Sequence, residues 1–267
     1  MTRFRTTEIS DPDYESNDLR FITVKTPHLK GRGDICVYVP DMPDATDLPI
    51  VILLHGVYGS AWIWSQKAGA HLTAARLIAA GKITPMVLAM PSDGLWGDGS
   101  AYLPHHQFDF EQWIVSDVPD AVIENLPQVS DQSPVFISGL SMGGFGALRL
   151  GAKYHDRFSG ISAHSSITHL DQMTLFIEEL VENYRQASKT SESVWGTILE
   201  NRHLLPPVRF DCGKDDLLIS YNSDLHRKME EAQIPHTYLE FPGKHEWSYW
   251  REHLEDTLLF FNGLLTT

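Results

Sequence analysis

Cysteine and long apolar stretches are the two features that this sequence most clearly lacks. Cys36 and Cys212 are the only cysteines in 267 residues and form no Cys-x-x-Cys pair, which argues against a disulfide scaffold and a structural zinc site. No run approaches the roughly 18 apolar residues of a membrane-spanning helix. Residues 1–21 contain no apolar signal-peptide core, so we expect a cytoplasmic protein with no membrane partner.

Basic residues are also in short supply. The 21 lysines and arginines face 35 aspartates and glutamates, which gives a formal net charge of −14. Nucleic acids and anionic membranes are bound mainly through Lys and Arg, so neither is an expected partner. No cluster of ligand-type side chains requires a metal or a cofactor, and none is predicted. The hydrophobic share of 42% is ordinary for a globular protein and suffices for a large core.

The N-terminal part of the chain predicts antiparallel strands. Residues 1–18 are polar and are expected to form a loose lead-in. The segments Leu19–Thr26 and Asp34–Val39 alternate apolar and polar residues on either side of a glycine-containing turn, which is the pattern of a β-hairpin. A connector rich in Pro and Asp then leads to residue 49.

From residue 49 onward, apolar runs typical of strands buried on both faces alternate with stretches of helical spacing. The predicted strands are Pro49–Leu54, Pro85–Met90, Val135–Ser138, Phe158–Ala163, Val208–Cys212 and His236–Phe241. The predicted helices are Gly69–Ala80, Phe110–Asn125, Gly144–Tyr154, Ile219–Gln233 and Trp247–Leu265. This alternation predicts a single α/β domain, residues 1–267, with a mostly parallel sheet and helices on both faces. Residues 168–205 interrupt it and are expected to form a small helical cap insertion.

The stretch PVFISGLSMGGFG, residues 134–146, contains a G-x-S-x-G pattern centred on Ser141. The pattern is short enough to arise by chance, so its context decides its meaning. Ser141 follows an apolar strand and precedes a helix, which would place its hydroxyl on a strained turn above the sheet. Gly139 and Gly143 provide the space that such a turn needs. We therefore predict that Ser141 is a catalytic nucleophile rather than a serine in a packing turn.

A serine nucleophile needs a base and an orienting carboxylate, which are expected after later strands. His245 lies in the loop after the last strand, whereas His236 begins that strand and His253 lies within the final helix. His245 is therefore the predicted base. The carboxylate is expected in the loop after the preceding strand, where Asp215 and Asp216 are adjacent. Strand position does not distinguish these two aspartates.

The oxyanion of an acyl-transfer intermediate needs two N–H donors. One is predicted to be the amide of Met142, directly after the nucleophile. The other is predicted in the loop after the first buried strand, where Gly56 lets the backbone turn inward and Val57 follows. His55 precedes this loop, and we expect it to form structural hydrogen bonds rather than to act as a base.

Together these motifs resemble the α/β-hydrolase esterases related to esterase D (S-formylglutathione hydrolase). That group includes small acetyl-ester hydrolases, feruloyl esterases and mycolyltransferases. The matching stretches, spread over most of the chain, are LLHGVYGS, AMPSDG, ISGLSMGGFGAL, FDCGKDDLL and PGKHEWSYW. The resemblance implies an α/β-hydrolase fold, a Ser–His–Asp triad and activity on small acyl esters.

The resemblance also assigns individual residues. In that family the acid stands three residues after the glycine of its loop, which favours Asp216 over Asp215. The family's elbow serine, final-loop histidine and oxyanion donors match Ser141, His245, Val57 and Met142. The family often has Gly-Gly-His in the last motif, whereas Lys244 precedes the histidine here.

Five tryptophans near the predicted catalytic edge are candidates for substrate contact: Trp62, Trp64, Trp96, Trp247 and Trp250. Packing accounts better for the last two, which begin the final helix. Trp96 lies in a glycine-rich loop and is the predicted substrate contact.

We predict a serine carboxylesterase whose partner is a small-molecule ester. An acyltransferase with the same triad and a non-catalytic binding protein on the same fold are the alternatives. The sequence names neither the natural ester nor the oligomeric state, and a homo-oligomer remains open.

Overall fold

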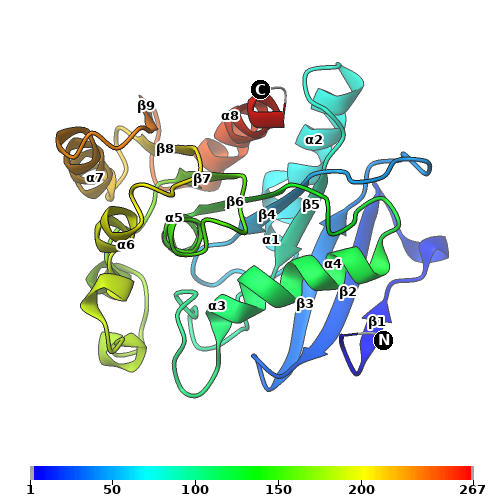
Figure 1. Cartoon of the computed structure of the whole chain (residues 1–267), viewed down its shortest axis with the longest axis horizontal. Helices are drawn as coiled ribbons and strands as arrows, with labels where there is room; N and C mark the ends of the chain where they lie inside the picture. Colours follow the sequence, from blue (N-terminus) through cyan, green and yellow to red (C-terminus); the bar gives the residue numbers. More distant parts are fainter. Residues whose placement is uncertain (1–2, 266–267) are drawn as a thin grey trace.

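The computed structural model describes residues 3–265, and the four terminal residues of the predicted domain lie outside this range. Within it, a nine-stranded sheet has the order β1-β2-β3-β5-β4-β6-β7-β8-β9 (Figure 1). Its strands are β1 (Thr7–Ile9), β2 (Leu19–Thr26), β3 (Gly31–Tyr38), β4 (Ile50–Leu54), β5 (Val87–Pro91), β6 (Val135–Leu140), β7 (Gly160–His164), β8 (Val208–Gly213) and β9 (Thr237–Phe241). The α-helices are α1 (Ile63–Ala68), α2 (Ala70–Ala79), α3 (Phe110–Gln112), α4 (Val118–Asn125), α5 (Met142–Lys153), α6 (Val194–Glu200), α7 (Ile219–Glu231) and α8 (Trp247–Leu265).

The sheet combines an antiparallel N-terminal part with a parallel remainder. β2 and β3 form the predicted hairpin, in which Leu19 pairs with Tyr38 and Thr26 pairs with Gly31. β3 also pairs antiparallel with β5. From β5 through β4, β6, β7 and β8 to β9, each pair of neighbours is parallel. Helices connect these parallel strands because a parallel pair needs a long crossover. The prediction of a mostly parallel sheet preceded by an antiparallel hairpin is confirmed.

The N-terminal residues are more ordered than the sequence indicates. Thr7–Ile9 forms β1, which pairs antiparallel with β2 through Thr7 and Val24. Phe4 is buried against the core. The expectation of a loose lead-in over residues 1–18 is therefore wrong for these residues. The edge of β2 presents backbone N–H and C=O groups, and β1 pairs with part of this edge. With only three residues, β1 is too short for its sequence to show the alternation of apolar and polar residues that indicates a strand.

Alternating side chains of the central strand separate two hydrophobic cores. In β4, Ile50, Ile52 and Leu54 face one core, whereas Val51 and Leu53 face the other, as the two-residue period of a strand requires. Helices α4, α5, α6 and α7 cover the first core, and α1, α2 and α8 cover the second. Figure 1 shows α4 lying across β2 and β3 on one side of the sheet. Helices thus cover both faces, as predicted.

Residues 168–205 connect β7 to β8 and are built mostly from short helices. They contain three 3-10 helices, Leu170–Leu175, Val181–Tyr184 and Lys189–Glu192, and then α6. The sequence indicated a mostly helical insertion, and α6 is its one α-helix within the described residues. A helix as short as α6 buries little surface by itself, so its packing against α5 and α7 fixes its place.

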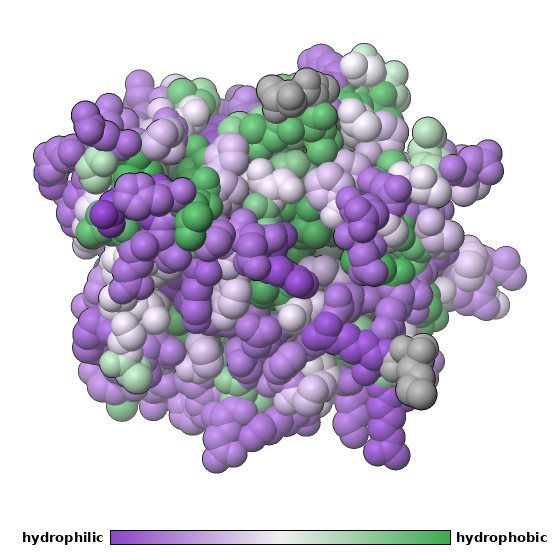
Figure 2. Space-filling view, in the orientation of Figure 1, coloured by the Kyte–Doolittle hydropathy of each residue, from purple (hydrophilic) through white to green (hydrophobic). Residues whose placement is uncertain are grey.

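The view in Figure 2 shows a mostly hydrophilic face, with apolar groups mainly in its upper half. This agrees with the 21% share of charged residues in the sequence. Among the helices of residues 3–265, none is both long and apolar enough to cross a membrane.

Candidate active site

Ser141 lies at a sharp turn between β6 and α5. Its backbone has φ 54° and ψ −117°, a conformation that is costly for a residue with a side chain. The Ser141 amide donates to the His164 carbonyl at 3.0 Å and holds the turn. A Cβ on Gly139 would lie 2.3 Å from the Gly143 carbonyl oxygen, so a side chain has no room there. The strand–turn–helix context expected for a nucleophilic serine is therefore present.

His245 lies in the loop between β9 and α8 and faces Ser141. Its Nε2 is 3.0 Å from Ser141 Oγ, a distance suited to proton transfer from the hydroxyl. Phe176 stacks on the imidazole with ring centroids 5.2 Å apart, and Trp250 contacts it edge-on at 4.9 Å. The ring is thus fixed by aromatic neighbours and is only 13% exposed.

Asp216, in the loop after β8, contacts the imidazole from the other side. His245 Nδ1 lies 3.1 Å from Asp216 Oδ1 and 3.0 Å from Oδ2. Asp216 is buried, whereas the adjacent Asp215 is exposed. Burial acts to raise the pKa of Asp216, but hydrogen bonds from His245 and the Leu218 amide outweigh it and lower this pKa below its usual value. The structure brings Asp216 rather than Asp215 to the imidazole.

A buried polar network joins β8 to α8, the elements that flank the loops of the candidate base and acid. Asp211 Oδ1 accepts a hydrogen bond from the Tyr249 hydroxyl at 2.8 Å. Asp211 Oδ2 lies 2.9 Å from His164 Nδ1 and 2.5 Å from Arg209 Nη1. Burial alone would raise the pKa of Asp211, but His164, Arg209 and Tyr249 lower it to about 2.

Acid is expected to weaken the fold through Asp211. A carboxyl with a lowered folded-state pKa stabilises the fold above its ordinary pKa of 3.8, and this contribution is lost as the pH falls through the folded value of about 2. We expect the free energy of unfolding, from urea titrations, to decrease as the pH is lowered through this range. Tyr249→Phe removes one donor to Asp211 and raises its folded-state pKa toward 3.8, so the variant's total loss of stability in acid should be smaller and should level off at a higher pH. Superimposable curves of stability against pH for the two proteins would contradict this account.

Val57 and Met142, the predicted oxyanion donors, flank Ser141. Met142 begins α5 and is fully buried, and Val57 follows β4 and lines the cavity beside the serine. A Cβ on Gly56 would lie 3.3 Å from Ser141 Cβ, so the two loops are in close contact. Within residues 3–265, neither the Val57 nor the Met142 amide donates a hydrogen bond to a protein acceptor. Unpaired N–H groups at a buried site are rare and suit a ligand oxygen.

His55 has the structural role expected for it. Its Nε2 accepts from the Asp93 amide at 3.1 Å, and its Nδ1 lies 2.7 Å from the Gly56 carbonyl oxygen and donates to it. Because backbone groups occupy both ring nitrogens, His55 holds the loop and is not available as a base. His236 and His253 hydrogen-bond to side chains outside the site.

A cavity of about 250 Å³ opens beside Ser141 and His245. Its walls are mostly apolar, and Lys67 supplies a cation whose Nζ lies 5.6 Å from the Trp247 ring centroid. The residues that line it are Gly56, Val57, Tyr58, Ile63, Lys67, Leu140, Ser141, Phe176, His245, Trp247 and Trp250. A mostly apolar cavity beside a polar reaction centre suits the acyl or alcohol part of an ester.

Sequence reasoning missed several of these lining residues. Ile63 and Lys67 are four residues apart on α1, a helix that the sequence did not predict, and this spacing places them on one face. Tyr58 directly follows Val57, the predicted oxyanion donor, and this position in the sequence could have indicated that Tyr58 lines the cavity. Phe176 comes from the 168–205 insertion, and no local pattern pointed to it. Trp250 was assigned to packing and both packs in the core and lines the cavity.

Trp96 does not lie where it was predicted. Its half-buried ring packs against His105, His106 and Tyr184, with centroid distances of 4.6, 4.8 and 5.2 Å. It is not among the described residues that line the cavity at Ser141. The glycine-rich sequence of the loop suggested that the Trp96 ring is exposed to a ligand. In the folded protein the loop instead packs this ring into an aromatic cluster. The contacts observed for Trp96 are packing contacts, and its substrate-binding role stays a prediction.

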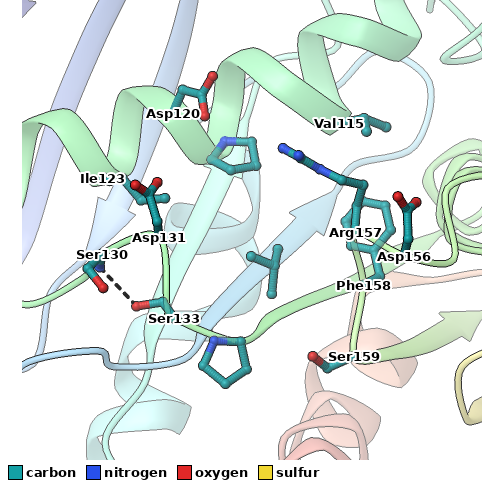
Figure 3. A pocket seen from close by; sticks show the side chains of 13 residues that line it. Val115, Asp120, Ile123, Ser130, Asp131, Ser133, Asp156, Arg157, Phe158 and Ser159 are labelled. Carbon is teal, nitrogen blue, oxygen red and sulfur yellow. Dashed lines mark hydrogen bonds between the residues drawn. The ribbon is translucent and has the colours of Figure 1, made fainter.

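A larger cavity of about 390 Å³ lies at the opposite end of β6, where Val135 begins the strand. Figure 3 shows side chains of α4 and of two loops around it, with Arg157 extending toward the helix. Asp120, Asp131 and Asp156 also line it, and its described lining contains no histidine. In residues 3–265 no group of three or more His, Cys, Asp or Glu side chains is placed to hold a metal ion. The smaller cavity, with its serine and histidine, is the candidate active site.

Comparison with known proteins places the chain in a family. Residues 26–261 match the family described as "Putative esterase". The chain belongs to this esterase family. It is therefore a carboxylic ester hydrolase by family, and the resemblance seen in its motifs is confirmed. An acetyl esterase from Caldicellulosiruptor saccharolyticus is 26% identical over 258 residues, which cover 88% of each chain.

Solved structures of other esterases share the fold of this family member. A ferulic acid esterase superposes with a TM-score of 0.80 at 21% identity, covering 97% of this chain and 99% of that one. The S-formylglutathione hydrolase FrmB from Staphylococcus aureus gives a TM-score of 0.77 at 17% identity, covering 95% and 98%. The predicted α/β-hydrolase fold is thereby confirmed.

Proposed function

We propose that this esterase hydrolyses small acyl esters through a covalent acyl-enzyme on Ser141. His245 Nε2 takes the hydroxyl proton while Ser141 Oγ attacks the ester carbonyl carbon. The oxyanion that forms accepts hydrogen bonds from the amides of Val57 and Met142. As the carbon–oxygen bond to the alcohol breaks, His245 passes the proton to the departing oxygen.

Water completes the cycle. His245 removes a proton from a water molecule, whose oxygen attacks the acyl carbon, and Ser141 regains the proton as the acid leaves. Asp216 accepts a hydrogen bond from Nδ1–H of His245 in both halves. This contact keeps the imidazole in the tautomer that can accept at Nε2 and stabilises the imidazolium that forms.

The observation that carries this proposal is the continuous contact from Ser141 through His245 to Asp216 within one cavity. The nucleophile–base distance of 3.0 Å and the base–carboxylate distances of 3.0 and 3.1 Å are those an activated serine needs. Membership of an esterase family and similarity to an acetyl esterase support an ester as the substrate. The cavity of about 250 Å³ favours short acyl chains.

Rapid-mixing hydrolysis of p-nitrophenyl acetate, butyrate and octanoate tests this function. We expect a burst of p-nitrophenol of about one equivalent per enzyme before the steady state, because the acyl-enzyme forms faster than it is hydrolysed. Acetate and butyrate should be turned over faster than octanoate. Binding without turnover of any ester would contradict the proposal and indicate a binding protein. Acyl transfer to an added alcohol that outcompetes water would instead indicate an acyltransferase.

A further inference from the structure

The insertion between β7 and β8 is attached to the loops beside Ser141 at two points. Tyr58, next to the proposed oxyanion donor, donates its hydroxyl to the Phe176 carbonyl. The Asp98 carboxylate accepts from the Glu178 amide at 2.7 Å, and the Glu179 carboxylate accepts from the Asp98 amide at 3.1 Å. These contacts join chain segments about eighty to 118 residues apart. They hold the insertion against the cavity.

Residues 176–179, here called the strap, place one aromatic ring in the cavity wall. The rings of Phe176 and His245 are stacked, with planes inclined by 25°. Phe176 is half-buried and lines the cavity, whereas its neighbour Leu175 is 52% exposed and is absent from the described lining. The side chain of Phe176 therefore occupies the volume beside the Ser141–His245 pair.

The strap is also coupled to the loop after β4, which contains the proposed oxyanion donor Val57. The Tyr58 amide donates to the Asp98 carbonyl at 2.8 Å, so one residue of that loop contacts both anchoring points of the strap. The Tyr58 side chain is 64% exposed, and its hydroxyl reaches back to the Phe176 carbonyl. Loss of this hydroxyl would release one end of the strap while leaving the buried core intact.

We propose that Phe176, held in place by the Tyr58 hydroxyl, sets the upper size of the ester that this enzyme accepts. The proposal rests on the esterase function proposed above. Close-packed walls do not admit extra methylene groups unless a side chain moves. A short ester fits beside Phe176, whereas a longer chain must displace a ring that is stacked on His245 and tied to Tyr58. Phe176 is thus a specificity residue supplied by the insertion.

The test compares the ratio of kcat/KM for long and short esters in two series. p-Nitrophenyl octanoate against acetate extends the acyl side, and octyl against ethyl acetate extends the alcohol side. In one of these series, Phe176→Ala should raise the long-to-short ratio by roughly tenfold or more, the scale that pocket contacts give. Tyr58→Phe should raise it in the same series by a smaller factor. Phe176→Trp should lower it.

Leu175→Ala is the matched control, because it truncates the preceding exposed residue and should leave both ratios unchanged. Unchanged ratios in Phe176→Ala, or an equal loss of activity on all esters, would overturn the proposal. If Phe176→Ala does not fold, an unchanged long-to-short ratio of kcat/KM in Tyr58→Phe would overturn the proposal. Failure of the proposed function is a separate result, since the wild-type enzyme would then turn over none of the esters.

Discussion

Ser141→Ala is expected to lower kcat for p-nitrophenyl acetate by roughly 10⁴-fold or more, with little loss of stability. Alanine removes the oxygen that lies 3.0 Å from His245 Nε2 and that forms the proposed acyl-enzyme. The burst of p-nitrophenol should disappear with it. Rapid mixing measures the burst, and steady-state assays measure the residual turnover.

Ser138→Ala is the matched control for this variant. Ser138 lies in β6, three residues before Ser141, and is fully buried. Its hydroxyl has no hydrogen-bond partner among the described residues, so its removal should change kcat by less than about twofold. A retained burst in Ser141→Ala would show that another group is the nucleophile. Thermal unfolding of both variants identifies any loss that comes from misfolding.

Asp216→Asn is expected to lower kcat/KM by roughly 10³- to 10⁴-fold. The amide keeps the size of the carboxyl, but its NH₂ group can donate to Nδ1 of His245. Nε2 then carries the proton and cannot accept one from Ser141. The lowered pKa of Asp216 shows that the surrounding donors favour the charged carboxylate, which the substitution removes.

Asp215→Asn makes the same chemical change one residue earlier in the same loop. Asp215 is exposed and should tolerate the change with less than about a threefold effect on kcat/KM. Assaying both variants on p-nitrophenyl acetate gives the ranking directly. Equal effects, or a larger loss in Asp215→Asn, would show that the acid is misassigned.

The order of the elements could be predicted from the sequence because it depends on local patterns. The apolar runs and helical spacings after residue 49 located the parallel strands and most helices to within a few residues. The predicted helix Phe110–Asn125 is α3, a π-helical segment (Trp113–Asp117) and α4 in one continuous stretch. β1 and α1 were missed, because three and six residues are too few to show a period.

The candidate site also has a part that the sequence predicts and a part that it does not. Ser141 and His245 could be located from the sequence because each follows a strand, and the carboxyl ends of parallel strands meet at one edge of the sheet. The loop of the acid could also be located. Asp215 and Asp216 follow the same strand, however, and the sequence distinguished them only through family resemblance.

Only the tertiary structure decided which side chains surround Ser141 and His245. The loop after β8 turns the Asp216 carboxylate inward to His245 and the Asp215 carboxylate out to solvent. The apolar–polar periodicity of the sequence does not encode this difference in orientation. Phe176 lies at the site although it comes from an insertion without a repeating pattern. Trp96 lies in an aromatic cluster instead. These residues come from loops far apart in the chain, so their contacts exist only after the sheet has assembled. The sequence therefore determined which candidate catalytic side chains meet at the sheet edge, and the fold decided their geometry and the shape of the cavity.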